Sequence, residues 1–292
     1  MSDGQPILRT SLLDLLHELR DQPIPLILGG GYGLYLKQVH LQDTLSSPTL
    51  IPGELWPAPR ATGDLDVLLQ TEVVVDSERM RLIRAALDRL GYTAIPGAEY
   101  MQFIKRLGSG RIVKVDLLTG PLGPYADDPR VKVDDRRVRP RPSVNLHAHR
   151  TDEALAFQEH TMAIPVTGAL STGDLHEATV HVPPAFTLLL MKLHAFRDRC
   201  NDDQKQFARH HALDIYRIAA MMVEQEFVQT RLLATEHQDH LPFIEASRIA
   251  REHFASDESL GSLRLREHKL WTEDMALHKF LSALRDLFRP AG

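Results

Sequence analysis

Two aspartates lie one residue apart at the start of an aliphatic, β-branched run within residues 60–69. This composition is typical of a β-strand, in which alternate side chains share a face. Asp64 and Asp66 would therefore point the same way, while Leu65 and Val67 enter a core. Two neighbouring carboxylates repel each other unless a cation or a proton lies between them.

A divalent cation is one solution to this repulsion. Mg²⁺ binds through one or two carboxylates, keeps several waters and leaves positions for substrate phosphates. The alternative is a turn, because Thr62-Gly63-Asp64 is ordinary turn chemistry and Asp64 could cap a buried strand. For this segment alone, both interpretations stay open.

A third acid, Asp116, lies in the second strand of a predicted hairpin. Segments 100–107 and 111–118 flank Gly108-Ser109-Gly110, which is a hairpin signal. In the second segment Val113, Val115 and Leu117 share one face, and Lys114 and Asp116 share the other. Carboxylates from neighbouring strands that converge would complete a metal cradle. The alternative is an exposed acid on the polar face of the strand.

Three consecutive glycines, residues 29–31, follow an apolar run at 24–28 that predicts a short strand buried on both faces. A helix is expected to start near Tyr32. At such a turn, backbone N–H groups can approach an anion such as phosphate, although a tight turn is the more common reason for glycines. Neither a P-loop nor a dinucleotide-binding fingerprint fits these residues.

Periodicity and end signals predict the remaining elements of the first part of the chain. They are a helix over 11–20 capped by Thr10 and Ser11, a proline-rich surface excursion at 41–59 anchored by Trp56, a helix that begins at Ser77 and ends at Gly91, and strands over 161–167 and 176–182.

Past residue 183 the composition becomes helical. Apolar residues recur with helical spacing near 186–199, 212–222, 223–235, 243–255 and 272–288. We therefore predict an α/β core over 1–183 and a helical C-terminal domain over 184–292. Trp271 and the aliphatic stripe near it are interpreted as core.

The 292 residues are 43% hydrophobic and 25% charged, which is ordinary for a globular protein. A net charge of -5 argues against a protein that coats nucleic acid with its whole surface, but allows a local basic patch. The densest patch is Lys132, Arg136, Arg137, Arg139 and Arg141. It is interpreted either as a phosphate-steering surface or as a solvated loop neutralised by nearby aspartates.

The cysteine and histidine content limits which covalent cross-links and metal sites the chain can have. Cys200 is the only cysteine, so an intrachain disulfide and a cysteine zinc cluster are excluded. The pairs His147/His149 and His237/His240 lack nearby cysteines and are predicted to be surface histidines. No apolar stretch is long enough to cross a membrane, so we expect no membrane partner and a cytoplasmic protein.

Taken in order, these residues resemble the nucleotidyltransferase superfamily, in particular the AbiEii-like toxin nucleotidyltransferases, to which the MenT toxins belong. The resemblance runs from about Leu26 to Ala219. It is carried by Gly29-Gly30, Arg60-x-Thr62-x-Asp64-x-Asp66, Asp116, Met191-Lys192-Leu193-x-Ala195-x-x-x-Arg199 and His211-x-x-Asp214-Ile215. The ordered set is far more specific than any one motif.

The resemblance implies an α+β fold, namely a polymerase-beta-like mixed sheet flanked by helices, followed by a C-terminal helical bundle. It also implies Mg²⁺-dependent transfer of a nucleotidyl group from a nucleoside triphosphate to an acceptor hydroxyl, with tRNA as a candidate acceptor and a cognate antitoxin as a candidate partner. The implied roles, by position, are metal ligation by Asp64, Asp66 and Asp116, catalysis by Asp64, Asp66, Lys192 and Asp214, and nucleotide binding by Gly29, Gly30, Thr62 and Lys192.

The sequence departs from the family pattern at three places. Residues 41–59 lengthen the gap between the glycines and the paired acids, Gly31 adds a third glycine, and His210 stands where a longer basic residue is usual. Other acceptors, such as a small molecule or a protein side chain, stay open. A different class, a catalytically silent binding module of the same fold, is disfavoured because Asp64, Asp66, Lys192 and Asp214 are all present.

Overall fold

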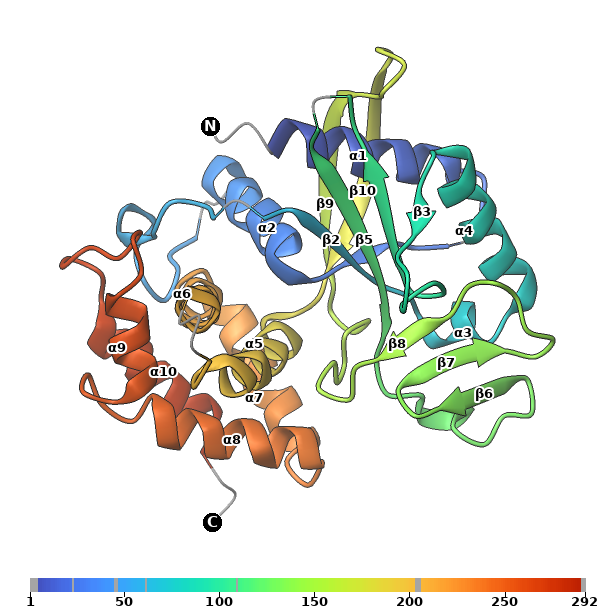
Figure 1. The fold of residues 1–292 in the computed structure, drawn as a ribbon. Helices are drawn as coiled ribbons and strands as arrows, with labels where there is room; N and C mark the ends of the chain where they lie inside the picture. Colours follow the sequence, from blue (N-terminus) through green and yellow to red (C-terminus); the bar gives the residue numbers. More distant parts are fainter. Residues whose placement is uncertain are drawn as a thin grey trace. The chain divides into compact units, whose positions relative to one another are not determined.

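The computed structural model describes residues 5–22, 24–44, 47–60, 62–108, 110–202 and 206–289, and Figure 1 shows their elements. The chain divides into two compact units. Unit one takes the chain up to Lys37 together with Arg60–Asp152 and His160–Pro183, and unit two takes Gln38–Pro59, Glu153–Glu159 and everything from Pro184 onward. The separation into domains at residue 183 stays a prediction.

Unit one is a mixed sheet with helices packed on it. Its elements are α1 (Gln5–Glu18), β1 (Ile27–Leu28), the start of α2 (Gly30–Thr44), β2 (Asp64–Leu68), α3 (Thr71–Val74), α4 (Ser77–Arg89), β3 (Thr93–Ala94), β4 (Gln102–Arg106), β5 (Ile112–Thr119), η2 (Gly123–Tyr125), β6 (Val131–Asp134), β7 (Arg137–Pro140), β8 (Ala148–Arg150), β9 (Met162–Ala169) and β10 (Leu175–Val182).

The strand order across the described residues is β6-β7-β8-β5-β2-β1-β10-β9, with β4 pairing β5 and β3 pairing β4. Three of the pairings, β2 with β5, β1 with β10 and β5 with β8, are parallel, and the others are antiparallel. The predicted α+β class with a mixed sheet and flanking helices is confirmed. Parallel pairing of β2 with β5 determines where the acids lie.

The core of unit one lies between this sheet and α1. Helix α1 packs on β9 and β10, and Figure 1 shows it crossing the sheet next to α4. Strand alternation explains the burial, since Leu65 and Val67 of β2 and Val115 of β5 are buried, whereas Asp64 and Asp66 are half-buried. The faces of β2 and β5 therefore divide into an apolar and an acidic side.

Two helix starts differ from the sequence prediction. Helix α1 begins at Gln5, so Thr10 does not cap it, and the Thr10 hydroxyl donates to the Ala169 carbonyl at 3.0 Å. Helix α4 is capped by Asp76 instead of Ser77, because the Asp76 carboxylate accepts hydrogen bonds from two backbone N–H groups of the first turn. The Asp76 carboxylate therefore has the capping role that was predicted for the Ser77 hydroxyl.

Two strand predictions also change. Of the apolar run 24–28, only Ile27–Leu28 pairs with other strands. The polar segment near 127–141, for which a solvated loop was one interpretation, instead forms the antiparallel hairpin β6–β7 around the buried Val138. The predicted hairpin of β4 and β5 is confirmed, and Ser109 of its turn lies outside the described residues.

Unit two is helical. Its elements are the end of α2, η1 (Gly53–Leu55), α5 (Ala185–Arg199), α6 (Gln206–Ala220), α7 (Glu224–Glu236), α8 (Leu241–His253), α9 (Leu260–Arg266) and α10 (Leu277–Leu287). Helix α5 packs against α6, α7 and α8. Trp56 is buried and its Nε1 donates to the Ile51 carbonyl at 2.7 Å, which confirms it as an anchor. The sequence missed α9, because seven residues hold too few turns for a clear period.

Among the described residues, no helix is both long and apolar enough to cross a lipid bilayer.

Candidate functional site

Parallel pairing of β2 and β5 brings the three predicted acids together within unit one. Asp66 lies directly opposite Asp116, and Asp64 lies directly opposite Lys114. In-register neighbours on parallel strands share a face, so all four side chains project from the same side of the sheet. We call Asp64, Asp66 and Asp116 the acid cluster. Their roles in metal binding and catalysis stay predictions.

Lys114 is a residue that sequence reasoning placed on the acidic face but gave no role. Its Nζ donates to Asp116 Oδ2 at 2.8 Å, and the side chains of Lys114 and Asp116 are 28% and 15% exposed. The signal that could have found it was the alternation itself, because a lysine two residues before Asp116 must face the same way.

The electrostatics of the acid cluster reflect this crowding. Burial raises the pKa of Asp116 above its ordinary value, the Asp64 charge raises it further, and Lys114 opposes both effects. Burial lowers the pKa of Lys114, but its hydrogen bond to Asp116 and the charges of the three acids outweigh that cost, so the net shift is upward. Asp116 Oδ1 is buried and accepts no hydrogen bond from any described residue.

The glycine turn between β1 and α2 lies against Asp66. The backbone N–H of Gly29 donates to the Asp66 carbonyl at 2.8 Å. Gly30 has a φ of +58°, and a Cβ there would overlap Asp66 Oδ2. Only glycine satisfies both conditions. The turn therefore brings the N-terminus of α2 into direct contact with the acid cluster.

Thr62 lies beside this same helix start. A Cβ on Gly31 would stand 3.2 Å from Thr62 Oγ1 and 3.0 Å from Arg60 Nη2. The first turn of a helix presents unpaired N–H groups that favour an anion. The N-terminus of α2, the Thr62 hydroxyl and the Arg60 guanidinium together form surroundings suited to a phosphate.

The donor chemistry of the acid cluster suits Mg²⁺, although among the described residues no group of three or more acidic, histidine or cysteine side chains is arranged to hold a metal ion. Its donor set is carboxylate oxygen, which hard divalent cations prefer, and one of these oxygens, Asp116 Oδ1, is buried without a hydrogen-bond partner among the described residues. Three carboxylates outnumber the one lysine on this face of the sheet. A divalent cation would reduce the repulsion between them.

Lys192 and Asp214 are brought together within unit two. Lys192 Nζ donates to Asp214 Oδ2 at 2.8 Å, and Arg217 Nη1 donates to Asp214 Oδ1 at 3.1 Å. Arg217 Nε in turn donates to Gln38 Oε1 at 2.7 Å, and Gln38 Nε2 donates to the Pro57 carbonyl at 2.7 Å. We call Lys192, Asp214, Arg217 and Gln38 the buried network.

The members of the buried network differ in their exposure to solvent, which limits the role that each can have. The Asp214 side chain is 0% exposed, whereas that of Lys192 is 10% exposed. Asp214 is thus enclosed by its two cations, and Lys192 retains some access to solvent. Sequence reasoning missed Arg217, although its position three residues after Asp214 on a helix was a usable signal.

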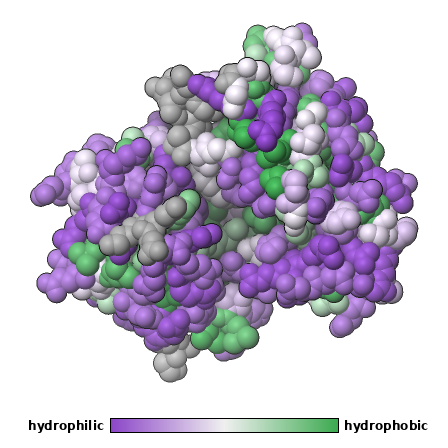
Figure 2. Space-filling view, viewed as in Figure 1, coloured by the Kyte–Doolittle hydropathy of each residue, from purple (hydrophilic) through white to green (hydrophobic). Residues whose placement is uncertain are grey.

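The basic cluster predicted from the sequence lies on the hairpin β6–β7. Asp134 pairs with Lys132 at 3.1 Å, Arg139 at 3.2 Å and Arg137 at 3.7 Å. One carboxylate shared by three cations leaves the hairpin positive. Figure 2 shows hydrophilic surface over this region.

His147 corrects the prediction of surface histidines. It is 4% exposed and stacks on Tyr100 with ring centroids 4.4 Å apart. Burial lowers the pKa of His147 to about 4, and the charges of Arg137 and Arg139 act in the same direction. His240 of the second pair is exposed, as predicted.

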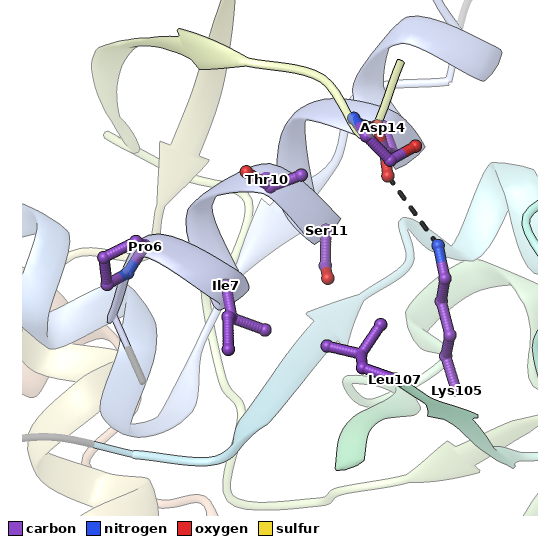
Figure 3. Close-up of a pocket in the computed structure, with 8 residues that line it drawn as sticks. Pro6, Ile7, Thr10, Ser11, Asp14, Lys105 and Leu107 are labelled. Carbon is purple, nitrogen blue, oxygen red and sulfur yellow. Dashed lines mark hydrogen bonds and ion pairs between the residues drawn. The ribbon is translucent and has the colours of Figure 1, made fainter. Parts of the chain in front are cut away.

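A cavity of about 220 Å³ lies at α1, and Figure 3 shows its lining. Asp14 and Lys105 face each other there, with Asp14 Oδ2 3.8 Å from Lys105 Nζ. Lys105 pairs with Val113, whose side chain is on the sheet face opposite to Asp116. This cavity is therefore separate from the acid cluster.

Comparison with known proteins gives a family. The family described as "Nucleotidyl transferase AbiEii toxin, Type IV TA system" matches residues 54–287. No curated protein sequence matches the chain. A similar solved structure is that of the antibiotic-resistance factor ANT(2'')-Ia, described as showing substrate-regulated conformation dynamics. It is 14% identical, covers 80% of this chain and 97% of its own, and gives a TM-score of 0.37.

At that TM-score the structural likeness adds nothing to the assignment, which rests on the family match over most of the chain and agrees with the motifs and the mixed sheet. The chain belongs to the AbiEii family of nucleotidyltransferase toxins of Type IV toxin-antitoxin systems.

Proposed function

We propose that this nucleotidyltransferase works with Mg²⁺ and that the acid cluster holds the cation. The observation that carries the proposal is the register of β2 and β5, which sets Asp66 opposite Asp116 beside Asp64. Three carboxylates on one sheet face, with one buried oxygen lacking a partner among the described residues, are hard to explain as a structural device. Bound Mg²⁺ would supply neutralisation of the triphosphate charge.

The chain's own residues bind and orient the nucleoside triphosphate in this proposal. Gly29 and Gly30 allow the start of α2 to approach the phosphates, and Thr62 offers a hydroxyl beside it. Lys192 contributes a cation for the triphosphate. Asp214 is a positioning residue, because a fully enclosed carboxylate acts through the side chains that it holds, among them Lys192 and Arg217.

The acceptor hydroxyl is proposed to belong to RNA, with tRNA as the first candidate. The positive hairpin β6–β7 supports this, because a chain of net charge -5 must collect its cations locally to bind a polyanion. A small molecule, a protein side chain or a silent binding role are the alternatives. The family assignment supports a cognate antitoxin as a partner, and we propose a cytoplasmic setting.

The decisive experiment supplies each labelled nucleoside triphosphate, with Mg²⁺, to the protein together with total RNA and a cell lysate. Label should appear in RNA with one preferred triphosphate, and should be absent with Asp66→Asn. Asp88→Asn, at an exposed acid of α4, is the matched control and should transfer normally. Transfer by Asp66→Asn at the wild-type rate would place the metal site elsewhere, and label in protein or in a small molecule would replace RNA as acceptor.

A further inference from the structure

The cavity at α1 contains a buried carboxylate with one unused oxygen. The Asp14 side chain is only 5% exposed. Its Oδ1 accepts a hydrogen bond from the backbone N–H of Ser171 at 2.8 Å, whereas its Oδ2 is buried and accepts none from any described residue. A buried acceptor without a donor costs free energy, so a group that brings a donor to Asp14 Oδ2 would bind favourably.

Lys105 of β4 brings a cation to the same point. Its Nζ lies 3.8 Å from Asp14 Oδ2, which is beyond hydrogen-bond range, and its side chain is 18% exposed. Figure 3 shows the two side chains extending toward each other from α1 and β4. The two charges balance, and both groups can still form hydrogen bonds. A charged ligand would disturb this balance in a partly buried place, so a neutral ligand is favoured.

The remaining lining of the cavity is mostly apolar. Ile7 and Leu107 point toward each other across it, with Ser11 next to them (Figure 3). The volume of about 220 Å³ is several times the roughly 30 Å³ share of one water molecule. Apolar walls with a few convergent polar groups are typical of small-molecule sites, although those for drug-sized ligands are larger. A cavity of this size suits a single small ring.

We propose that this cavity binds a small neutral ligand through an N–H group that lies beside a carbonyl oxygen, as in a carboxamide, a lactam or a nucleobase. The N–H donates to Asp14 Oδ2, and the carbonyl oxygen accepts from Lys105 Nζ. The site lies on the sheet face opposite to Asp116, so it is separate from the acid cluster. The inference does not depend on the proposed function.

Two probes that share one ring size test the proposal. 2-Pyrrolidone carries an N–H beside its carbonyl, and γ-butyrolactone has a ring oxygen in place of that N–H. Each is titrated into the full chain, labelled with ¹⁵N and with ¹³C at its methyl groups, while NMR follows the backbone N–H of Ser171 and the methyl groups of Ile7.

In the wild type, 2-pyrrolidone should shift both signals and saturate at the millimolar concentrations expected of so small a ligand. The lactone should bind on the order of tenfold more weakly, because it leaves Asp14 Oδ2 unpaired. Equal binding of the two probes, or no saturable shift with 2-pyrrolidone, overturns the inference.

Asp14→Asn removes the unused acceptor and keeps the shape of the side chain. The backbone N–H of Ser171 holds the amide oxygen at the position of Oδ1, so the amide nitrogen takes the position of Oδ2 and presents a donor to the ligand's donor. The preference for 2-pyrrolidone over the lactone should disappear. The matched control is Asp174→Asn, at an exposed acid of the β9–β10 loop that accepts from Thr172 Oγ1 at 2.8 Å. It should bind like the wild type, and loss of the preference in both variants would contradict the role of Asp14.

Lys105→Met provides a second, independent variant, which removes the cation and leaves the Asp14 charge unbalanced. The variant should prefer pyrrolidinium, a positively charged ring of the same size, over 2-pyrrolidone, whereas the wild type should prefer 2-pyrrolidone. Melting temperatures verify that each variant is folded, and this variant carries the test if Asp14→Asn is not. A wild type that prefers pyrrolidinium would make the cavity a cation site and overturn the inference.

Acetamide and uracil distinguish the possible sources of the ligand, because both carry an N–H beside a carbonyl oxygen. Tighter binding of uracil would assign the cavity to a nucleobase, and tighter binding of acetamide would assign it to an open-chain carboxamide. Failure of both to compete with 2-pyrrolidone would contradict the recognition chemistry that we propose.

Discussion

The acid cluster of unit one and the buried network of unit two both combine carboxylates with cationic side chains, but in opposite proportions. The cluster holds three carboxylates and one lysine, all partly accessible, whereas the network holds one enclosed carboxylate between lysine and arginine. A charge surplus that solvent can reach is suited to capture an ion. A buried charge that is fully paired is suited to hold a side chain in place, and removing one partner is costly. The same substitution should therefore affect activity more in the acid cluster and stability more in the buried network.

Asp66→Asn should produce the largest effect, a loss of nucleotidyl transfer on the order of 10³-fold, because it removes a residue that we propose as a ligand of the catalytic metal. Its stability without metal should fall less than that of Asp214→Asn, since Asp66 is half-buried whereas Asp214 is fully buried. Single-turnover rates and urea unfolding in EDTA measure the two quantities. A large loss of stability would mean that the acid cluster is structural and would remove the contrast.

Asp214→Asn should destabilise the fold by about 3–5 kcal/mol, because two buried cations lose their shared anion. Urea unfolding without metal or nucleotide measures this directly. As a control, Asp88→Asn removes a carboxylate that pairs with Arg84 at an exposed position and should cost less than about 1 kcal/mol. Equal costs at the two positions would show that the buried network does not stabilise the unit.

Lys192→Ala should weaken triphosphate binding or slow transfer by about 2 kcal/mol, the scale of one lost charge-assisted contact. The comparison becomes sharper if Lys192→Arg, which keeps the charge, restores part of the binding while Asp214→Asn reduces it. Binding of a non-hydrolysable triphosphate, with melting temperature measured alongside, distinguishes a lost contact from a lost fold. Unchanged binding in folded Lys192→Ala would assign the lysine to structure alone.

Substitution of His147 should give the smallest effect on stability. This residue differs from both regions above, because it is a buried ionisable group with cations beside it. Its pKa is about 4 in the folded chain and near 6.5 when unfolded, because burial and then Arg137 and Arg139 oppose its protonation. Between these values the unfolded chain binds the extra proton, so stability falls as pH drops from 6.5 toward 4, by at most about 1.4 kcal/mol per pH unit. His147→Phe, which keeps an aromatic ring against Tyr100, should flatten this slope in urea unfolding at pH 7, 6 and 5.

Sequence patterns between near neighbours predicted the faces of the strands and the class of the fold. Alternation along residues 64–68 and 112–119 separated the acidic from the apolar face, and the predicted mixed sheet with flanking helices is the observed class. The predicted start of α4 was wrong because Asp76 and Ser77 are both good N-cap residues. The local sequence does not show which of the two caps the helix. The hairpin β6–β7 was missed because polar and charged residues obscure its alternation around Val138.

The candidate site could be predicted only as far as its residues are adjacent in sequence or follow the family motifs. Lys114 was placed on the correct face, but its hydrogen bond to Asp116 depends on a side-chain choice that periodicity does not contain. The partner Gln38 lies 179 residues from Arg217, and no local pattern connects residues so far apart. His147 was assigned to the surface because burial beside Tyr100 arises from tertiary packing alone.

The backbone conformation of Gly30 predicts how mutations at this codon affect the toxin. Its positive φ and the absence of space beside Asp66 Oδ2 apply to every amino acid that carries a Cβ. All missense alleles at this codon should therefore share one phenotype, loss of nucleotide handling, whatever the size or charge of the new residue. When cells are forced to express the chain without an antitoxin, survivors should accumulate many different amino acids at Gly30.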